Sequence, residues 1–207
     1  MHKNDGQIPV EELGTLDFIF KNGKHTAENV DGVRWIKDNK GLVHIIEHPL
    51  WLINKTDENG QVISKSEMRN LYVAGIDGID IGQDQTSEYT KDPSKFSIVI
   101  KRRAYGLEPP QYVAYYMFRP DDLRDAYRTA IKLLMYYNCR CNIEATRLSM
   151  LNWARDRGWV NYFMKRPRKT YPEEKIKASN TYGTPATIAI IEHQTDLIKD
   201  YVEDYCD

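Results

Sequence analysis

Three strand patterns in close succession constrain the fold of this chain most strongly. Apolar runs rich in β-branched and aromatic residues occupy 71–81, 96–103 and 112–119. A polar loop through Pro93 joins the first two runs, and the turn sequence YGLEPP at 105–110 joins the second to the third. Sequential strands with short connections pair most simply as an antiparallel meander.

Helical and extended patterns alternate through the rest of the chain. They are helical at 120–138, extended at 139–145, helical at 147–158, extended at 159–164 and helical at 184–205. Pro120 suits the first turn of the first of these helices, and Thr184 and Pro185 suit the N-cap and first position of the last. A strand–helix–strand crossover adds a parallel strand to the sheet. The sequence therefore predicts an α/β fold with a mixed sheet, first three antiparallel strands and then parallel ones, flanked by helices. This is the layout of ribonuclease-H-like nucleases, in which the fourth strand lies beside the first.

Residues 1–70 differ in composition from residues 71–207. They are rich in Gly, Asn, Asp and Lys, with one strand-like run at 41–53 and a turn sequence, DENGQ, at 57–61. We expect an N-terminal arm or linker that packs on the following domain through Trp35, Trp51 and Leu52.

Carboxylates stand at the ends of two predicted strands. Asp77 ends the apolar part of the first strand, and Asp80 and Asp84 follow it in the loop. A carboxylate at the inner end of a strand requires a compensating cation, either a side chain or a metal ion. In the fourth strand, alternation places Cys139, Cys141 and Ile143 on one face and Arg140, Asn142 and Glu144 on the other. If the fourth strand lies beside the first, Glu144 comes near Asp77.

Converging carboxylates suit a phosphodiesterase that uses two metal ions. Mg²⁺ or Mn²⁺ prefers hard oxygen ligands and commonly binds one or two carboxylates together with substrate phosphate. Two such ions about 3.5–4 Å apart activate the attacking water and stabilise the leaving oxygen. Asp80 and Asp84 could bind such an ion through water or be plain turn residues. Plainer roles also stay open for Asp77, as a salt-bridged strand end, and for Glu144, as the opening residue of a helix.

Two groups of basic residues are candidate contacts to DNA phosphates. They comprise Lys101, Arg102 and Arg103 in the second strand, and Lys165, Arg166, Arg168 and Lys169 after the fifth. Clustered cations near a carboxylate site give sequence-tolerant, salt-dependent binding. The alternative is an ordinary solvated surface, and Glu173 and Glu174 dilute the second group.

Charge and cysteine content narrow the class of protein. The 207 residues carry a formal net charge of −1, so nucleic-acid binding must rest on local patches. Cys139, Cys141 and Cys206 are an odd number without zinc-site spacing, which favours reduced thiols inside a cell. The N-terminus lacks an apolar signal core, and no apolar run has the length of a membrane span. We expect a soluble intracellular protein.

These motifs together resemble a known family. The segments LYVAGIDGID, FSIVIKRR, VAYYMFRPDD, YYNCRCNIEATR, YFMKRPRK and YGTPATIAIIEHQTDLIKDYVEDY are similar, in this order, to the C-terminal nuclease domain of tailed-phage terminase large subunits. The resemblance is closest to phages that infect gut Bacteroides-type bacteria, and it covers the chain from about residue 41 to residue 207.

The resemblance implies a metal-dependent endonuclease of phage DNA packaging. Members of this family cut concatemeric double-stranded DNA in the cytoplasm of the infected bacterium, together with an ATPase domain, a small terminase subunit and the portal. Asp77 matches the family's metal-binding aspartate on the first strand, and Glu144 matches the acid on the fourth.

The chain departs from the family pattern in two respects. It contains no G-x-x-x-x-G-K-[ST] motif, so we expect an excised or separately encoded domain without the ATPase. The family's third metal carboxylate follows a later strand, whereas the late candidate here is Asp196, which also suits a solvated helix face beside His193 and Lys199. A C-terminally truncated domain without that acid would cleave weakly. The rival interpretations are another ribonuclease-H-like nuclease, such as a resolvase, and a non-catalytic module that docks DNA or the portal.

Overall fold

The strands and helices follow the predicted order closely in the second half of the chain. The computed structural model describes residues 11–21, 27–50, 52–56, 62–66, 70–79, 94–145, 148–165 and 182–205. Its strands are β1 (Glu12–Phe20), β2 (Val30–Lys37), β3 (Val43–Ile45), β4 (Leu52–Thr56), β5 (Val62–Ser66), β6 (Tyr72–Asp77), β7 (Phe96–Arg102), β8 (Gln111–Phe118) and β9 (Arg140–Ile143). Its helices are α1 (Leu123–Tyr136), α2 (Ser149–Asp156) and α3 (Ile188–Tyr205), with 3₁₀ turns at Ala27–Asn29 and Val160–Tyr162.

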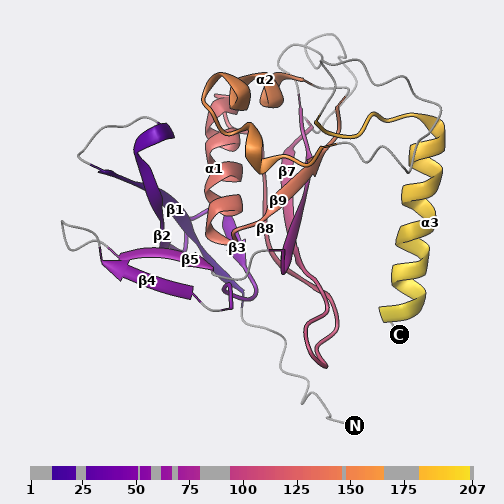
Figure 1. Cartoon of the computed structure of the whole chain (residues 1–207), viewed down its shortest axis with the longest axis horizontal. Helices are drawn as coiled ribbons and strands as arrows, with labels where there is room; N and C mark the ends of the chain where they lie inside the picture. The colour runs from indigo at the N-terminus through magenta and orange to yellow at the C-terminus, as the bar shows by residue number, and fades with distance from the viewer. Residues whose placement is uncertain are drawn as a thin grey trace.

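The nine strands form one mixed sheet in the order β4-β5-β2-β1-β3-β8-β7-β6-β9 (Figure 1). Strands β6, β7 and β8 pair antiparallel as the expected meander. After α1 crosses over, β9 pairs parallel with β6. The prediction that the fourth strand of this half lies beside the first is therefore confirmed, as is the coarse assignment to an α/β fold with a mixed sheet.

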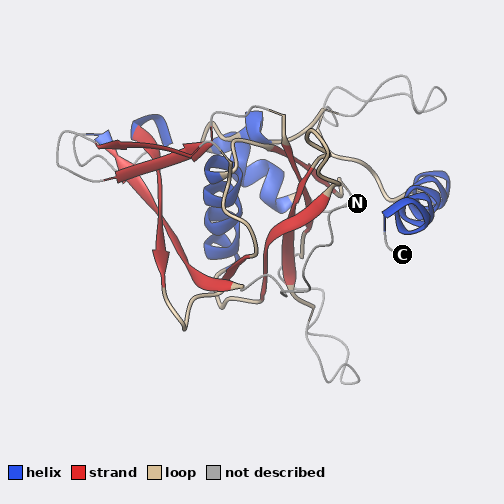
Figure 2. Ribbon diagram, turned by 90° about the horizontal axis from the view of Figure 1, so that it is seen from below, coloured by secondary structure: helices blue, strands red, loops and turns tan. Residues whose placement is uncertain are grey.

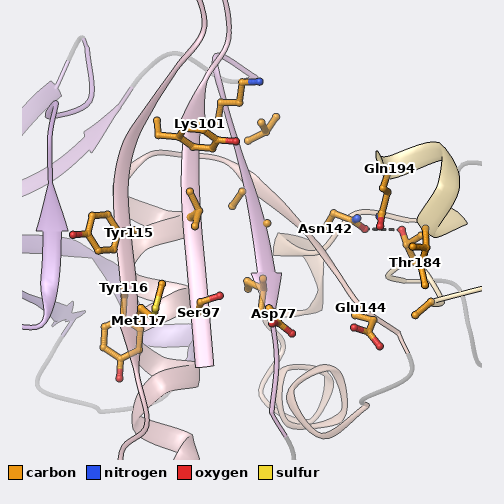
Figure 3. Close-up of a pocket in the computed structure, with 18 of the residues that line it drawn as sticks. Asp77, Ser97, Lys101, Tyr115, Tyr116, Met117, Asn142, Glu144, Thr184 and Gln194 are labelled. Carbon is orange, nitrogen blue, oxygen red and sulfur yellow. Dashed lines mark hydrogen bonds between the residues drawn. The ribbon is translucent and has the colours of Figure 1, made fainter. Parts of the chain in front are cut away.

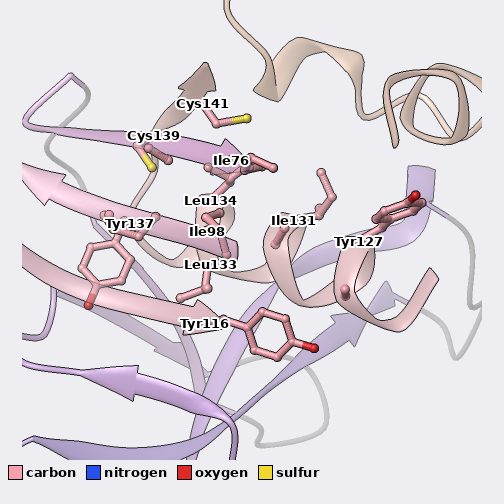
Figure 4. Close-up of a cluster of buried hydrophobic side chains, with 14 of the residues drawn as sticks. Ile76, Ile98, Tyr116, Tyr127, Ile131, Leu133, Leu134, Tyr137, Cys139 and Cys141 are labelled. Carbon is pink, nitrogen blue, oxygen red and sulfur yellow. The ribbon is translucent and has the colours of Figure 1, made fainter. Parts of the chain in front are cut away.

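Helix α1 covers one face of the sheet because its apolar residues recur at helical spacing. The helix begins at Leu123, and its N-cap is Asp122, whose side chain accepts a hydrogen bond from the backbone N–H of Arg124. Its buried residues belong to one hydrophobic cluster with alternate residues of the sheet, among them Ile76, Ile98 and Cys141 (Figure 4). We call this covered surface of the sheet the helix face.

The N-terminal region is not the arm that its composition predicts. Within its described residues, β1 to β5 continue the same sheet, and β3 joins them to β8 through the pairing of Val43 with Tyr116. The run at 41–53 yields only the short strand β3 before the chain bends, and Ile46 N–H and Glu47 N–H both donate to the carbonyl of Val113. Trp35 packs partly buried against the core as expected, whereas Trp51 and the Leu52 side chain lie outside the described part.

Two elements near the C-terminus differ from the sequence prediction. The expected fifth strand at 159–164 is a 3₁₀ turn followed by a single parallel bridge between Phe163 and Cys141. Thr184 is not a helix N-cap. Its backbone N–H donates to the carbonyl of Ile143 at 2.8 Å, and its carbonyl accepts from Ala145 N–H at 2.8 Å, so the segment before α3 extends the sheet next to β9.

Helix α3 stands apart from the rest of the domain in two views (Figures 1 and 2). Ile190 near its start is buried, but Ile191 and Ile198 are 50% and 64% exposed. Within the part of the chain that the structure describes, no helix combines the length and apolarity needed to cross a membrane.

Candidate functional site

A cavity of about 970 Å³ lies on the side of the sheet that faces away from α1. Its floor consists of alternate residues of β6, β7 and β9, and the start of α3 contributes Ile191 and Gln194 to its wall (Figure 3). We call this surface of the sheet the cavity face. It carries Val73, Gly75, Asp77, Ser97, Val99, Lys101, Asn142 and Glu144.

Asp77 and Glu144 both line this cavity, at neighbouring positions of two adjacent parallel strands. The last paired residues of β6 and β9 are Ile76 and Ile143, and the next residue of each chain segment is one of the two acids. Because side chains at the same register of adjacent strands point to the same face, both carboxylates project to the cavity face. Figure 3 shows them at the same end of the cavity.

Asp77 and Glu144 differ in exposure and in the backbone contacts that position them. Asp77 is the last residue of β6 and is exposed, so its carboxylate is not the buried strand end that the sequence suggests. Glu144 is half-buried and forms a parallel bridge with Thr184. A Cβ at Gly183 would lie 2.7 Å from the carbonyl oxygen of Ile143, and its φ of +77° favours glycine, so this residue permits the close approach of the Thr184 segment.

The remaining lining is mostly uncharged. Thr184 Oγ1 donates to Asn142 Oδ1 at 2.8 Å, which holds the amide beside Glu144 on the cavity face. Ser97 pairs with Asp77 across β7 and β6 and also lines the cavity. Tyr116 is also among the lining residues, but it pairs with buried Ile98 and belongs to the hydrophobic core, where burial raises the pKa of its hydroxyl to about 12.

Asp77 and Glu144 are the lining carboxylates that could hold a divalent cation, with substrate and water as its further ligands. Mg²⁺ and Mn²⁺ commonly bind proteins through one or two carboxylates together with phosphate oxygens. Among the described residues, no three His, Cys, Asp or Glu side chains cluster as a complete metal site. Asp80 lies outside the described residues, so its predicted metal role stays a prediction.

Asp196 does not lie at this site. It lies on the exposed surface of α3, where Lys199 Nζ lies 3.5 Å from its Oδ1, and it does not line the cavity. The solvated helix face is therefore the interpretation that its surroundings favour.

The predicted basic residues fall into different environments. Lys101 lines the cavity at the end opposite the carboxylates, and Arg103 is exposed (Figure 3). Arg102 points to the helix face, because it pairs with Tyr72 and alternates with Lys101. It is 2% exposed, and its Nε lies 3.0 Å from Glu47 Oε1, in ion-pair contact without hydrogen-bond alignment. A buried guanidinium cannot meet a DNA phosphate in this structure, so we correct that expectation for Arg102.

Lys165 is exposed after the Phe163 bridge, whereas Arg166, Arg168 and Lys169 lie outside the described residues. Sequence reasoning missed Ser97, Asn142 and Thr184. The two-residue alternation from Glu144 could have indicated Asn142, but Ser97 requires the strand register and Thr184 requires the path of a distant segment.

Comparison of the chain with protein-family models, with curated proteins and with solved structures found no match in any of the three.

Proposed function

We propose that this protein is a metal-dependent DNA endonuclease of the ribonuclease-H-like type, corresponding to the nuclease domain of a phage terminase large subunit. One observation carries the proposal: Asp77 and Glu144 lie at adjacent register positions of two parallel strands and line the same cavity. The antiparallel β6–β7–β8 meander with β9 parallel to β6 supports the ribonuclease-H-like assignment. The resemblance of the sequence motifs supports the terminase assignment.

In this proposal Asp77 and Glu144 hold two Mg²⁺ or Mn²⁺ ions. When bound, the ions supply activation of the attacking water and charge stabilisation of the leaving oxygen. Asp77, exposed at the end of β6, and Glu144, on the neighbouring strand, would hold the ions, and the substrate phosphate would complete their coordination. Asn142, fixed by Thr184, would limit the motion of the backbone next to Glu144.

The test is nicking of supercoiled plasmid in Mn²⁺, with EDTA as the metal-free control. We expect Asp77→Asn and Glu144→Gln each to reduce nicking by at least about 100-fold, because several kcal/mol of charge stabilisation depends on the metal site. Asp196→Asn is the matched control, since it removes a carboxylate from α3 outside the cavity. It should nick at the wild-type rate. Equal loss in all three variants would show that α3 supplies a third acid, contrary to the arrangement described above.

A non-catalytic DNA-docking module is the second candidate. It is favoured by the lack of a three-acid cluster among the described residues. If the wild-type protein fails to nick in Mn²⁺ but shifts the same plasmid on a native gel, this second candidate replaces the first.

A further inference from the structure

A second cavity lies beside β9, on the side away from β6. It has a volume of about 530 Å³ and is lined by Arg140, Asn161, Phe163, Met164, Lys165 and Tyr182. Among these described residues, two are cations, two carry further hydrogen-bonding side chains, and none is acidic. Arg140 and Lys165 are both exposed to solvent. This combination favours an anionic ligand.

Strand register relates this cavity to the carboxylate site. Val73 of β6 is paired with Lys101 of β7 on one side and with Arg140 of β9 on the other. Lys101 and Arg140 therefore flank the same position of the central strand. Arg140 alternates with buried Cys141 and lies on the same side of β9 as Asn142 and Glu144.

The basic and acidic positions are separated by a fixed length of strand. Glu144 follows Arg140 by four residues, and Asp77 follows Val73 by four residues. At 3.3 Å per residue, the cations precede the carboxylates by about 13 Å along the strands. Base pairs of B-DNA are stacked at about 3.4 Å, so this distance places the cations and the carboxylates at different phosphates of a bound duplex.

We propose that Arg140 and Lys165 form a phosphate-binding pocket that holds the DNA backbone about 13 Å from the scissile phosphate, with Lys101 at the same register position on the other side of β6. This inference rests on the proposed nuclease function for the position of the cut, but the binding of backbone phosphate by the pocket is independent of cleavage. Arg140 contributes a planar guanidinium, which binds phosphate oxygens through two N–H groups. Asn161 and Tyr182 provide further polar groups at the same cavity. Because the pocket would contact phosphates and not base edges, it would position the duplex without sequence preference.

The experiment is a binding titration of a fluorescein-labelled duplex by anisotropy, in EDTA, at several salt concentrations. The variant is the double substitution Arg140→Gln and Lys165→Gln. The matched control is Arg34→Gln with Arg128→Gln, which changes the net charge equally at two exposed arginines of β2 and α1. Loss of two phosphate contacts should make the negative slope of log K (the association constant) against log [salt] shallower by about two. It should also weaken binding at 0.1 M salt by tens of fold. The control should bind like the wild type.

Cleavage position gives a second readout. On an end-labelled duplex in Mn²⁺, the wild type should cut poorly close to one end, because no backbone phosphate then lies about 13 Å from the cut to occupy the pocket. The double variant should lose this end effect. An unchanged salt slope in the double variant, or an equal change in the control, would overturn the phosphate pocket. Wild-type binding with the expected slope but no nicking in Mn²⁺ would retain the pocket and remove the nuclease.

Discussion

The two faces of one sheet differ in what their residues do. On the helix face, β6, β7 and β9 present Ile76, Ile98 and Ile143, which are at most 5% exposed and belong to the hydrophobic core. On the cavity face, the same strands present Asp77, Ser97 and Glu144 around a cavity. A period of two residues therefore places the buried apolar side chains on one face and the candidate site residues on the other. We expect substitutions on the two faces to separate these properties.

The largest loss of stability should follow from removing core volume on the helix face. Leu134 of α1 is fully buried, so Leu134→Ala should lower the free energy of unfolding by about 2–5 kcal/mol through lost burial and a residual cavity. Met117 on the cavity face of β8 is 55% exposed. Met117→Ala should change stability by less than about 1 kcal/mol. Urea unfolding of both variants measures the difference, and equal losses would mean that the cavity face also carries core packing.

Replacing a buried arginine of the helix face and an exposed arginine next to it should give the next largest difference in the free energy of unfolding. Arg102, 2% exposed on the helix face, lies 3.0 Å from Glu47 and 3.9 Å from Glu108. Arg102→Met leaves the Glu47 carboxylate without its buried partner and should lower the free energy of unfolding by about 2–4 kcal/mol. Arg103, the next residue, is exposed, and Arg103→Met should have an effect within about 0.5 kcal/mol. If Arg102→Met is neutral by urea unfolding, the ion pair contributes nothing net to the fold.

The buried cysteines should make the stability of the helix face sensitive to alkaline pH. Burial raises the pKa of both Cys139 and Cys141 above the ordinary thiol value of 9.0. Both states hold the proton below pH 9.0, but above it the unfolded thiols ionise while the folded ones stay protonated. Stability should therefore fall as pH rises through 9, by up to about 1.4 kcal/mol per pH unit for each thiol.

Unfolding measured between pH 8 and 10 checks this sign. A Cys139→Ala and Cys141→Ala double variant should show a flatter decline over that range than the wild type. Tyr112, which is 52% exposed at the cavity, provides the control, and Tyr112→Phe should leave the slope unchanged. An identical slope in the cysteine variant would assign the alkaline sensitivity to other groups.

The sequence predicted those strands and helices whose structure is specified by the pattern of their own residues. The three-strand meander, α1 and the alternation of Cys141 against Asn142 and Glu144 follow from hydrophobic period and capping alone. The crossover rule predicts that the strand after α1 is parallel, and the layout of ribonuclease-H-like nucleases places it beside β6, so the proximity of Asp77 and Glu144 on neighbouring strands could be anticipated.

The errors concern segments whose structure depends on distant partners. β1 to β5 contain many polar residues and are stabilised as strands by edge pairing with β8 through β3, which composition does not reveal. Thr184 has the residue type and context of an N-cap, but hydrogen bonds to Ile143 and Ala145 hold it in an extended position. Arg102 belongs to a basic run in the sequence, yet alternation turns it to the helix face while Lys101 lines the cavity.

The smallest change in stability should follow from replacing the two cavity carboxylates, and it should become measurable only when Mn²⁺ is present. Asp77 is exposed and Glu144 is half-buried, so Asp77→Asn with Glu144→Gln should leave stability in EDTA within about 0.5 kcal/mol of the wild type. Any change should be toward higher stability, because two neighbouring like charges are removed. In Mn²⁺ at ten times its Kd, the wild type should gain about 1.4 kcal/mol, because the ion binds the folded state. The variant should gain nothing. Thermal unfolding of both proteins in EDTA and in MnCl₂ measures the gain, and an equal gain in the variant would place the ion elsewhere than the cavity face.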